Sequence, residues 1–106
     1  MERKQAEMID VTIRFEARNY LLRASNLEML PSYRCEQLTK ARNTLHRGCV
    51  AFEDDGGSEL HEDLYLPLFD ALAFVNDALR QPDRVRERIT QALFVLDAAP
   101  VKGGVN

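Results

Sequence analysis

The stretch LYLPLFDALAFVNDAL, residues 64–79, decides the fold class of this chain. Its main apolar row advances by three or four residues, which is the period of an α-helix: Leu64, Leu68, Leu72, Val75 and Leu79. Eleven of its sixteen residues are Ala, Leu, Phe or Val, so the polar stripe beside them is narrow. The stretch therefore predicts a helix from about Ser58 to Leu79 with a broad apolar surface. Pro67 should either bend this helix or mark a later start.

The sequence on both sides of this stretch continues the helical period. A first helix is expected from about residue 2 to residue 30, where Pro31 ends it. A second is expected between a capping Ser32 and the Gly56-Gly57 pair, and a fourth begins after Pro82. Short connections place successive helices as antiparallel neighbours. The predicted fold is all-α: an up-down antiparallel bundle of about four helices with a long first helix, in a single domain over residues 1–100 and with a flexible tail over residues 101–106.

Gly48 and two cysteines lie inside the predicted second helix. A glycine there costs about 1 kcal/mol relative to alanine, which indicates either a close approach by another helix or a local break. Cys35 and Cys49 are fourteen residues apart, or about 21 Å along a helix, which is too far for a disulfide. Both thiols are expected to be reduced and to face the core.

Composition limits the class of function. The 106 residues are 45% hydrophobic and 29% charged, as in globular proteins. The net charge of −3 gives no bulk attraction to nucleic acid, so no direct nucleic-acid binding is expected. No apolar stretch is long enough to span a bilayer, which predicts no membrane insertion and favours a cytoplasmic location.

The apolar residues exceed what one small bundle can cover. The first segment carries a second apolar row beside its core row, and the aromatic residues of the third segment point in different directions. Contiguous uncovered apolar patches mark interfaces, although a fully central third helix remains an alternative. The predicted partner or dimer interface is therefore made by Met8, Val11, Phe15, Leu22, Leu68, Phe69, Leu72 and Phe74, with a polar rim of Arg80, Arg84 and Arg88.

Charged residues gather in two places. Six carboxylates and no Lys or Arg occur from Glu53 to Asp63, but they lack the alternation of a calcium loop and predict a solvated turn that starts a helix. Four arginines surround the start of the fourth helix, where positive charge is unfavourable; they indicate either an acidic partner or an ordinary arginine-rich surface. In an up-down bundle these two groups lie at opposite ends.

No motif indicates catalysis. His46 is expected to pack beside the core, and neither it nor His61 has a positioned nucleophile. The sequence contains no glycine-rich phosphate loop, paired-cysteine zinc site or HExxH motif. We therefore expect no enzymatic activity, no cofactor and no metal site.

The run from Ala41 to Phe52, an acidic turn and the apolar helix Leu64 to Leu79 resemble the QslA family of small helical quorum-sensing antiactivators. The resemblance covers about the middle half of the chain and includes no diagnostic motif. It implies a non-enzymatic homodimer that binds the ligand-binding domain of a LuxR-type transcription factor, LasR, and blocks its dimerisation and DNA binding. No functional residue transfers by motif.

The leading hypothesis is thus a dimeric protein-binding regulator that masks an apolar surface of a transcription factor. A secretion chaperone or a toxin-immunity protein would use the same chemistry on another target. A nucleic-acid binder that uses the basic turn is the third hypothesis.

Overall fold

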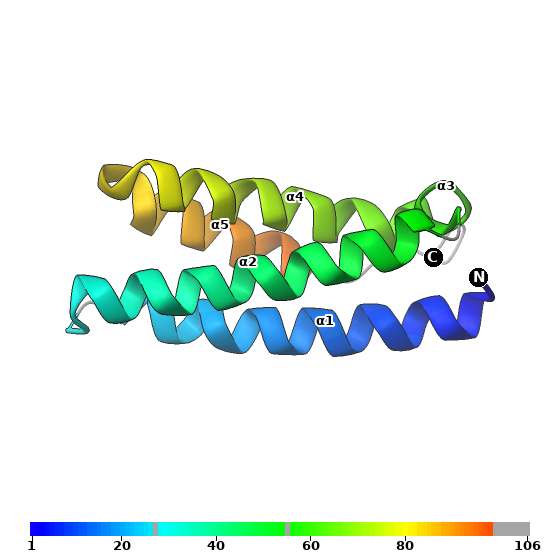
Figure 1. Cartoon of the computed structure of the whole chain (residues 1–106), viewed down its shortest axis with the longest axis horizontal. Helices are drawn as coiled ribbons and strands as arrows, with labels where there is room; N and C mark the ends of the chain where they lie inside the picture. Colours follow the sequence, from blue (N-terminus) through cyan, green and yellow to red (C-terminus); the bar gives the residue numbers. More distant parts are fainter. Residues whose placement is uncertain (27, 55, 99–106) are drawn as a thin grey trace.

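A computed structural model of the chain describes residues 1–26, 28–54 and 56–98, and the predicted tail over residues 101–106 lies outside them. The described residues form helices and turns without a strand. In chain order the elements are α1 Arg3–Ala24, α2 Pro31–Asp54, α3 Gly57–Leu60, α4 Glu62–Arg80, the 3-10 turn η1 Pro82–Arg84 and α5 Val85–Asp97. The four longer helices lie side by side and run in alternate directions along the chain (Figure 1). The prediction of an all-α fold is confirmed.

The first helix is shorter than predicted, because α1 ends at Ala24 and not near residue 30. Ser25 and Asn26 follow it, and both side chains bond to nearby backbone, the alternative to helix that these residue types favour. Arg34 of α2 donates from Nε to the Ala24 carbonyl at 3.1 Å. An arginine of the next helix therefore satisfies one of the free carbonyls at the end of α1.

Two other helix boundaries differ from the prediction, and one of the two alternatives for Pro67 is excluded. Pro31 is the first residue of α2, so Ser32 lies inside the helix and is not its cap. The predicted third helix is two helices, since the single turn α3 ends at Leu60 and α4 starts at Glu62, with His61 between them. Pro67 lies within α4 and does not mark its start.

Helix α1 packs closely against α2 at Gly48. A Cβ atom placed on Gly48 would lie 2.9 Å from Cγ2 and 3.0 Å from Cγ1 of Ile13. Such distances are below van der Waals contact, so α1 packs where only a glycine leaves room. Of the two predicted explanations for this glycine, the close approach is confirmed.

The core runs between the helices and is formed by one cluster of apolar side chains: Ala6, Ile13, Ala17, Leu21, Ala24, Leu38, Ala41, Leu45, Cys49, Phe52, Leu64, Leu68, Ala71, Val75, Ala78, Ile89, Ala92 and Leu96. Cys49 belongs to it, and burial raises its pKa to about 11. The prediction for Cys35 was wrong, because this thiol is exposed. Fourteen residues of helix leave a rotation of about 40° between the two side chains, which turns Cys35 out of the core.

One further expectation, about a histidine, was wrong. His46, which was expected to pack beside the core, is exposed on α2. His61 is instead the buried histidine, with 5% of its surface exposed.

Candidate functional site

The outer surface of α1 carries a stripe of exposed apolar side chains, which we call the α1 stripe: Met8, Val11, Phe15 and Leu22. The first three are 64–68% exposed, and Leu22 is 42% exposed. At 3.6 residues per turn this stripe lies on the opposite side of the helix from Ala6, Ile13 and Ala17, which are buried. The helix is therefore apolar on two opposite faces, and the described chain covers only one of them.

Charged residues flank the α1 stripe. Lys4 and Arg18 continue its spacing of three and four residues, and both are exposed. Arg18 donates from Nε to Asp97, the last residue of α5, at 2.6 Å. Glu7 lies on the same edge and accepts from Arg3 at 3.2 Å. The stripe thus has a border of mixed charge, part of which is held by ion pairs.

Arg14, which forms a largely buried ion pair with Asp10 on α1, also joins α1 to the end of α5. Asp10 and Arg14 have the four-residue spacing of a surface ion pair, but the Asp10 side chain is 6% exposed and the Arg14 side chain 16%. Burial raises the pKa of Asp10, and Arg14, which donates to it at 3.0 Å, opposes that effect. Arg14 also donates to backbone carbonyls at the end of α5, including those of Leu96 and Ala98. A guanidinium at a helix C-terminus satisfies free carbonyls and suits the helix dipole.

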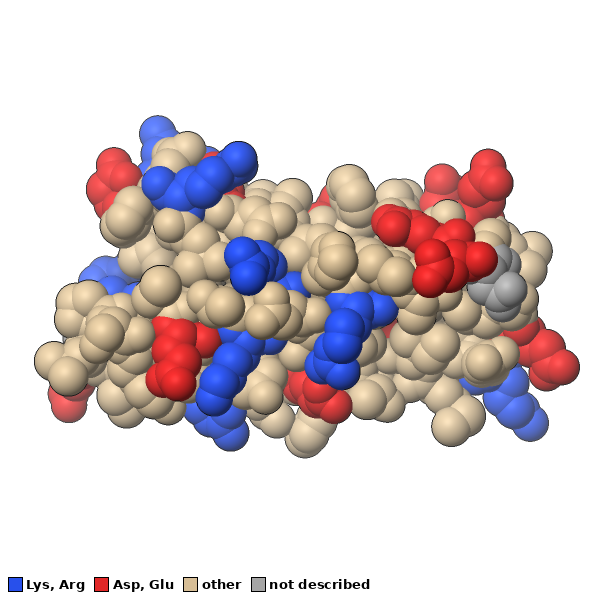
Figure 2. Space-filling model, viewed as in Figure 1, with Lys and Arg blue, Asp and Glu red and all other residues tan. Residues whose placement is uncertain are grey.

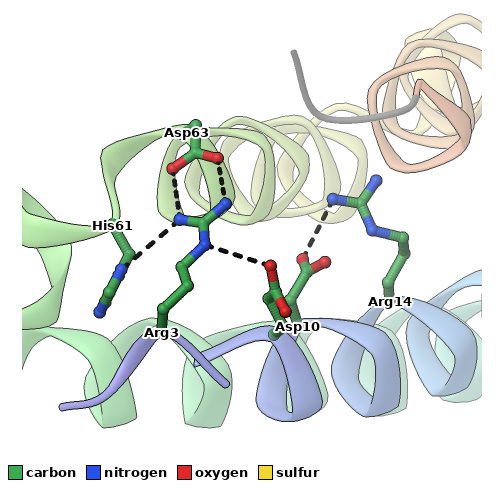
Figure 3. Close-up of polar contacts among 6 residues, drawn as sticks. Arg3, Asp10, Arg14, His61 and Asp63 are labelled. Atoms are coloured by element: carbon green, nitrogen blue, oxygen red, sulfur yellow. Dashed lines mark hydrogen bonds and ion pairs between the residues drawn. The ribbon is translucent and has the colours of Figure 1, made fainter. Parts of the chain in front are cut away.

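A second polar contact ties the start of α1 to α4 (Figure 3). Arg3 donates to both carboxylate oxygens of Asp63, at 2.8 and 2.6 Å, and this hydrogen bonding lowers the pKa of Asp63. His61 lies beside Arg3, with Nδ1 at 3.5 Å from the guanidinium and Nε2 at 2.9 Å from the Met1 carbonyl. Because a carbonyl only accepts, Nε2 carries the proton and donates it. These contacts and those of Arg14 hold both halves of α1 in place, with its stripe turned outward.

The outward side of α4 carries a second apolar row. Leu66 and Phe69 are 44% and 46% exposed, and Ala73 is also exposed. The Phe69 ring packs on Tyr65 at a centroid distance of 5.8 Å, and Tyr65 packs on the buried Phe52 at 6.1 Å. Tyr65 also donates its hydroxyl proton to Glu53 of α2. Phe69 is therefore supported by an aromatic row that reaches into the core.

The structure separates the predicted interface residues into three groups. Met8, Val11, Phe15, Leu22 and Phe69 are exposed. Leu72 and Phe74 are partly buried against the core. Leu68 is fully buried, so its assignment to a partner-facing surface is corrected: it lies on the side of α4 that packs into the bundle. The spacing identified the main row that contains Leu68, but the predicted interface also took Leu68 and Leu72 from that row.

The predicted polar rim is held largely within the chain. Arg88 donates to Asp77 of α4 and to Gln91 at 2.8 Å, and its side chain is 19% exposed, so it joins α4 to α5. Arg84 lies 3.8 Å from Glu87. Arg80 lies 3.7 Å from Asp77 with its side chain 76% exposed, and it is the most accessible of the three. These carboxylates explain why arginines are tolerated at the start of α5.

Sequence reasoning missed several exposed apolar residues, of which Leu60, Leu66 and Phe94 are 67%, 44% and 74% exposed. Leu66 was detectable, since it lies three residues before Phe69 and seven before Ala73. Phe94 stands alone on α5, and no pattern pointed to it. A groove of about 720 Å³ between the end of α1 and α5 was also missed; Ala24, Arg34, Ile89 and Leu93 are among its lining residues. It arises where two helices diverge, which a pattern within one helix does not show.

Charge is distributed unevenly over the surface. Figure 2 shows carboxylates near the α3 end of the molecule and a group of Lys and Arg at the other end, where α4 passes to α5. The expected separation of the acidic and basic groups is therefore confirmed. Within the described part of the chain, no helix is long and apolar enough to cross a membrane. The same residues contain no group of three His, Cys, Asp or Glu side chains placed to hold a metal ion.

The fold and its exposed faces are the basis for any functional conclusion, because comparisons with known proteins add none. No protein-family model, curated protein or solved structure matches this chain.

Proposed function

We propose that this chain is a non-enzymatic, homodimeric protein-binding regulator that uses the α1 stripe to cover an apolar surface of a transcription factor. The observation that supports this most directly is the exposure of Met8, Val11 and Phe15, which are 64–68% exposed in a row on one helix. Apolar side chains scattered singly on a surface need no explanation, whereas a contiguous row marks an interaction site.

The chemistry of the stripe suits a protein partner. Aromatic residues supply much of the binding energy at interfaces, and methionine adapts its flexible side chain to a partner's shape. Phe15 lies at the centre of the stripe, between Val11 and Arg18. The stripe is also presented rigidly, because Arg3 and Arg14 fix α1 to α4 and α5. A helix held in this way loses little conformational entropy on binding.

The resemblance to quorum-sensing antiactivators suggests the target. It implies the ligand-binding domain of a LuxR-type transcription factor such as LasR, and the α1 stripe would bind the surface through which that domain dimerises. Occupation of that surface would prevent dimerisation and therefore DNA binding. The arginines of the basic turn give little support to direct DNA binding, since Arg88 is already paired with Asp77.

A DNA mobility-shift assay tests this function. Wild-type chain should release the activator from its DNA site, and Phe15→Asp should lose this effect, because a buried unpaired charge at the interface is costly. Phe94→Asp is the matched control: Phe94 is an aromatic residue exposed to a similar extent on another helix, and its substitution should leave the release unchanged. Release by Phe15→Asp at wild-type concentrations would contradict the proposal, as would direct binding of the chain to the DNA.

A further inference from the structure

The outward row of α4 has the spacing of a helix-pairing seam. Its residues advance by four and three in strict alternation, and we call them the α4 seam: Glu62, Leu66, Phe69, Ala73, Asn76 and Arg80. All except the partly exposed Asn76 are exposed. Alternating steps of this kind keep side chains on one side of a helix and allow them to interlock with a second helix. The seam has apolar residues at its centre, an acidic residue at its start and a basic residue at its end.

We propose that a second copy of this chain occupies the α4 seam, with the two α4 helices antiparallel around a two-fold axis level with Ala71. This inference rests on the homodimer in the proposed function and identifies its interface. Two-fold symmetry makes such a surface self-complementary, so each residue must match its counterpart in the partner copy.

The sequence of the seam meets this condition at its two ends and at its centre. In antiparallel helices, residues equally distant from the axis in opposite directions lie opposite each other. Glu62 then faces Arg80 of the second copy, and Phe69 faces Ala73, each twice. The first pairing joins opposite charges, and the second places a large ring over a small side chain, as interlocking cores require. Leu66 faces Asn76, whose side chain lies at the border of the apolar centre.

The residues at the ends of the seam are free to make these pairs. Glu62 has no ion-pair partner among residues 1–26, 28–54 and 56–98. Arg80 contacts Asp77 only loosely, at 3.7 Å. Phe69 is already positioned by Tyr65, so the central contact costs little ordering.

The α1 stripe does not meet the same condition. An antiparallel pair of α1 helices centred on Ile13 would place Arg18 against Met8 and Lys4 against Leu22. A parallel pair would stack each cation on its own counterpart. The α4 seam therefore fits a second copy, and the α1 stripe remains available for a different protein.

Asp70 limits the strength of this dimer. It is exposed at one edge of the seam, next to the axis, so its two copies approach each other. A single pair of helices about 27 Å long also buries less surface than a standard interface. The dimer should consequently depend on concentration, and Asp70→Asn should tighten it about two- to threefold.

Sedimentation analysis over a range of concentrations tests the interface by charge exchange. Glu62→Arg and Arg80→Glu should each weaken dimerisation about tenfold, because each replaces two attractive pairs by two repulsive ones. The double variant Glu62→Arg/Arg80→Glu restores both pairs in reverse and should return to within about threefold of wild type. Phe15→Asp, which changes the α1 stripe and not the α4 seam, should dimerise as wild type does. Circular dichroism of each variant shows that the helices are retained.

The outcomes separate this inference from the proposed function. Single variants that weaken the dimer without recovery in the double variant would overturn the register, as would dimerisation unaffected by either single change. Loss of the dimer in Phe15→Asp alone would place self-association on α1 and overturn the inference. A monomer at every concentration would overturn this interface and the homodimer together, but would leave activator release by the α1 stripe to be judged by its own assay.

Discussion

Replacing Gly48 with alanine should destabilise the chain, although alanine is the better helix former. In an exposed helix the change would gain about 1 kcal/mol. Here the new Cβ would lie 2.9 and 3.0 Å from the two γ carbons of Ile13. Those atoms are next to the branch point of a stiff side chain and cannot rotate away cheaply. Overpacking of this kind costs about 1–3 kcal/mol, so the expected net loss of unfolding free energy is about 1 kcal/mol.

Urea unfolding followed by circular dichroism measures this loss. Asn43→Ala, at an exposed position of α2, is the control and should change the stability by less than about 0.5 kcal/mol. In an Ile13→Ala background the clash is absent, and Gly48→Ala should become neutral or stabilising, which gives a coupling of about 1–2 kcal/mol. Stabilisation of the wild-type chain by Gly48→Ala would refute the close approach, and with it the packing that turns the α1 stripe outward.

Three other predictions follow from the same contacts. Leu68→Ala should cost about 2–5 kcal/mol of unfolding free energy, as expected for a fully buried leucine, while activator release in the mobility-shift assay is unchanged at temperatures where the variant is folded. A thiol reagent should label Cys35 rapidly in the folded chain and Cys49 only on unfolding, because Cys49 is buried with a pKa of about 11. Mass spectrometry of the labelled peptides measures both rates, and equal rates would contradict this prediction. Arg3 lowers the pKa of Asp63 in the folded state. The stabilisation by this pair should therefore be full above the unfolded pKa of about 3.9 and lost as the pH falls through the lowered folded value. In urea titrations Asp63→Asn should remove this part of the acid dependence, and an unchanged profile would argue against the pair.

The periodicity of single segments predicted the helices and their inner faces well. Leu64, Leu68 and Val75 are buried and Leu72 is partly buried, whereas the row from Met8 to Phe15 is uncovered, as the spacing indicates. Helix ends were less accurate, because they depend on contacts between elements. The end of α1 depends on the side chains of Ser25 and Asn26 and on the hydrogen bond from Arg34 to the Ala24 carbonyl. The spacing of apolar residues along the helix does not report these contacts.

Buried polar residues were the other difficulty for sequence reasoning. Asp10 and Arg14 have the spacing of an exposed ion pair, yet they are buried because α5 ends beside them and offers its carbonyls. His61 is buried because the start of α1 covers it. Such placements follow from which helices meet, so the sequence of one helix does not specify them. Predicting which row of α4 is exposed also requires knowing which helices meet, because the packing of α2 and α5 against α4 determines which row remains outside.

Oxidation of Met8 tests the central claim most directly, because it reports whether the α1 stripe is open in the free chain and covered by a partner. Peptide mass spectrometry after brief peroxide treatment gives the rate for Met8, with the less exposed Met29 as an internal reference. The account predicts that Met8 oxidises faster than Met29 in the free chain and is strongly protected when the activator's ligand-binding domain is added at saturation, while Met29 changes little. Slow oxidation of Met8 in the free chain, or an unchanged rate in a demonstrated complex, would contradict it.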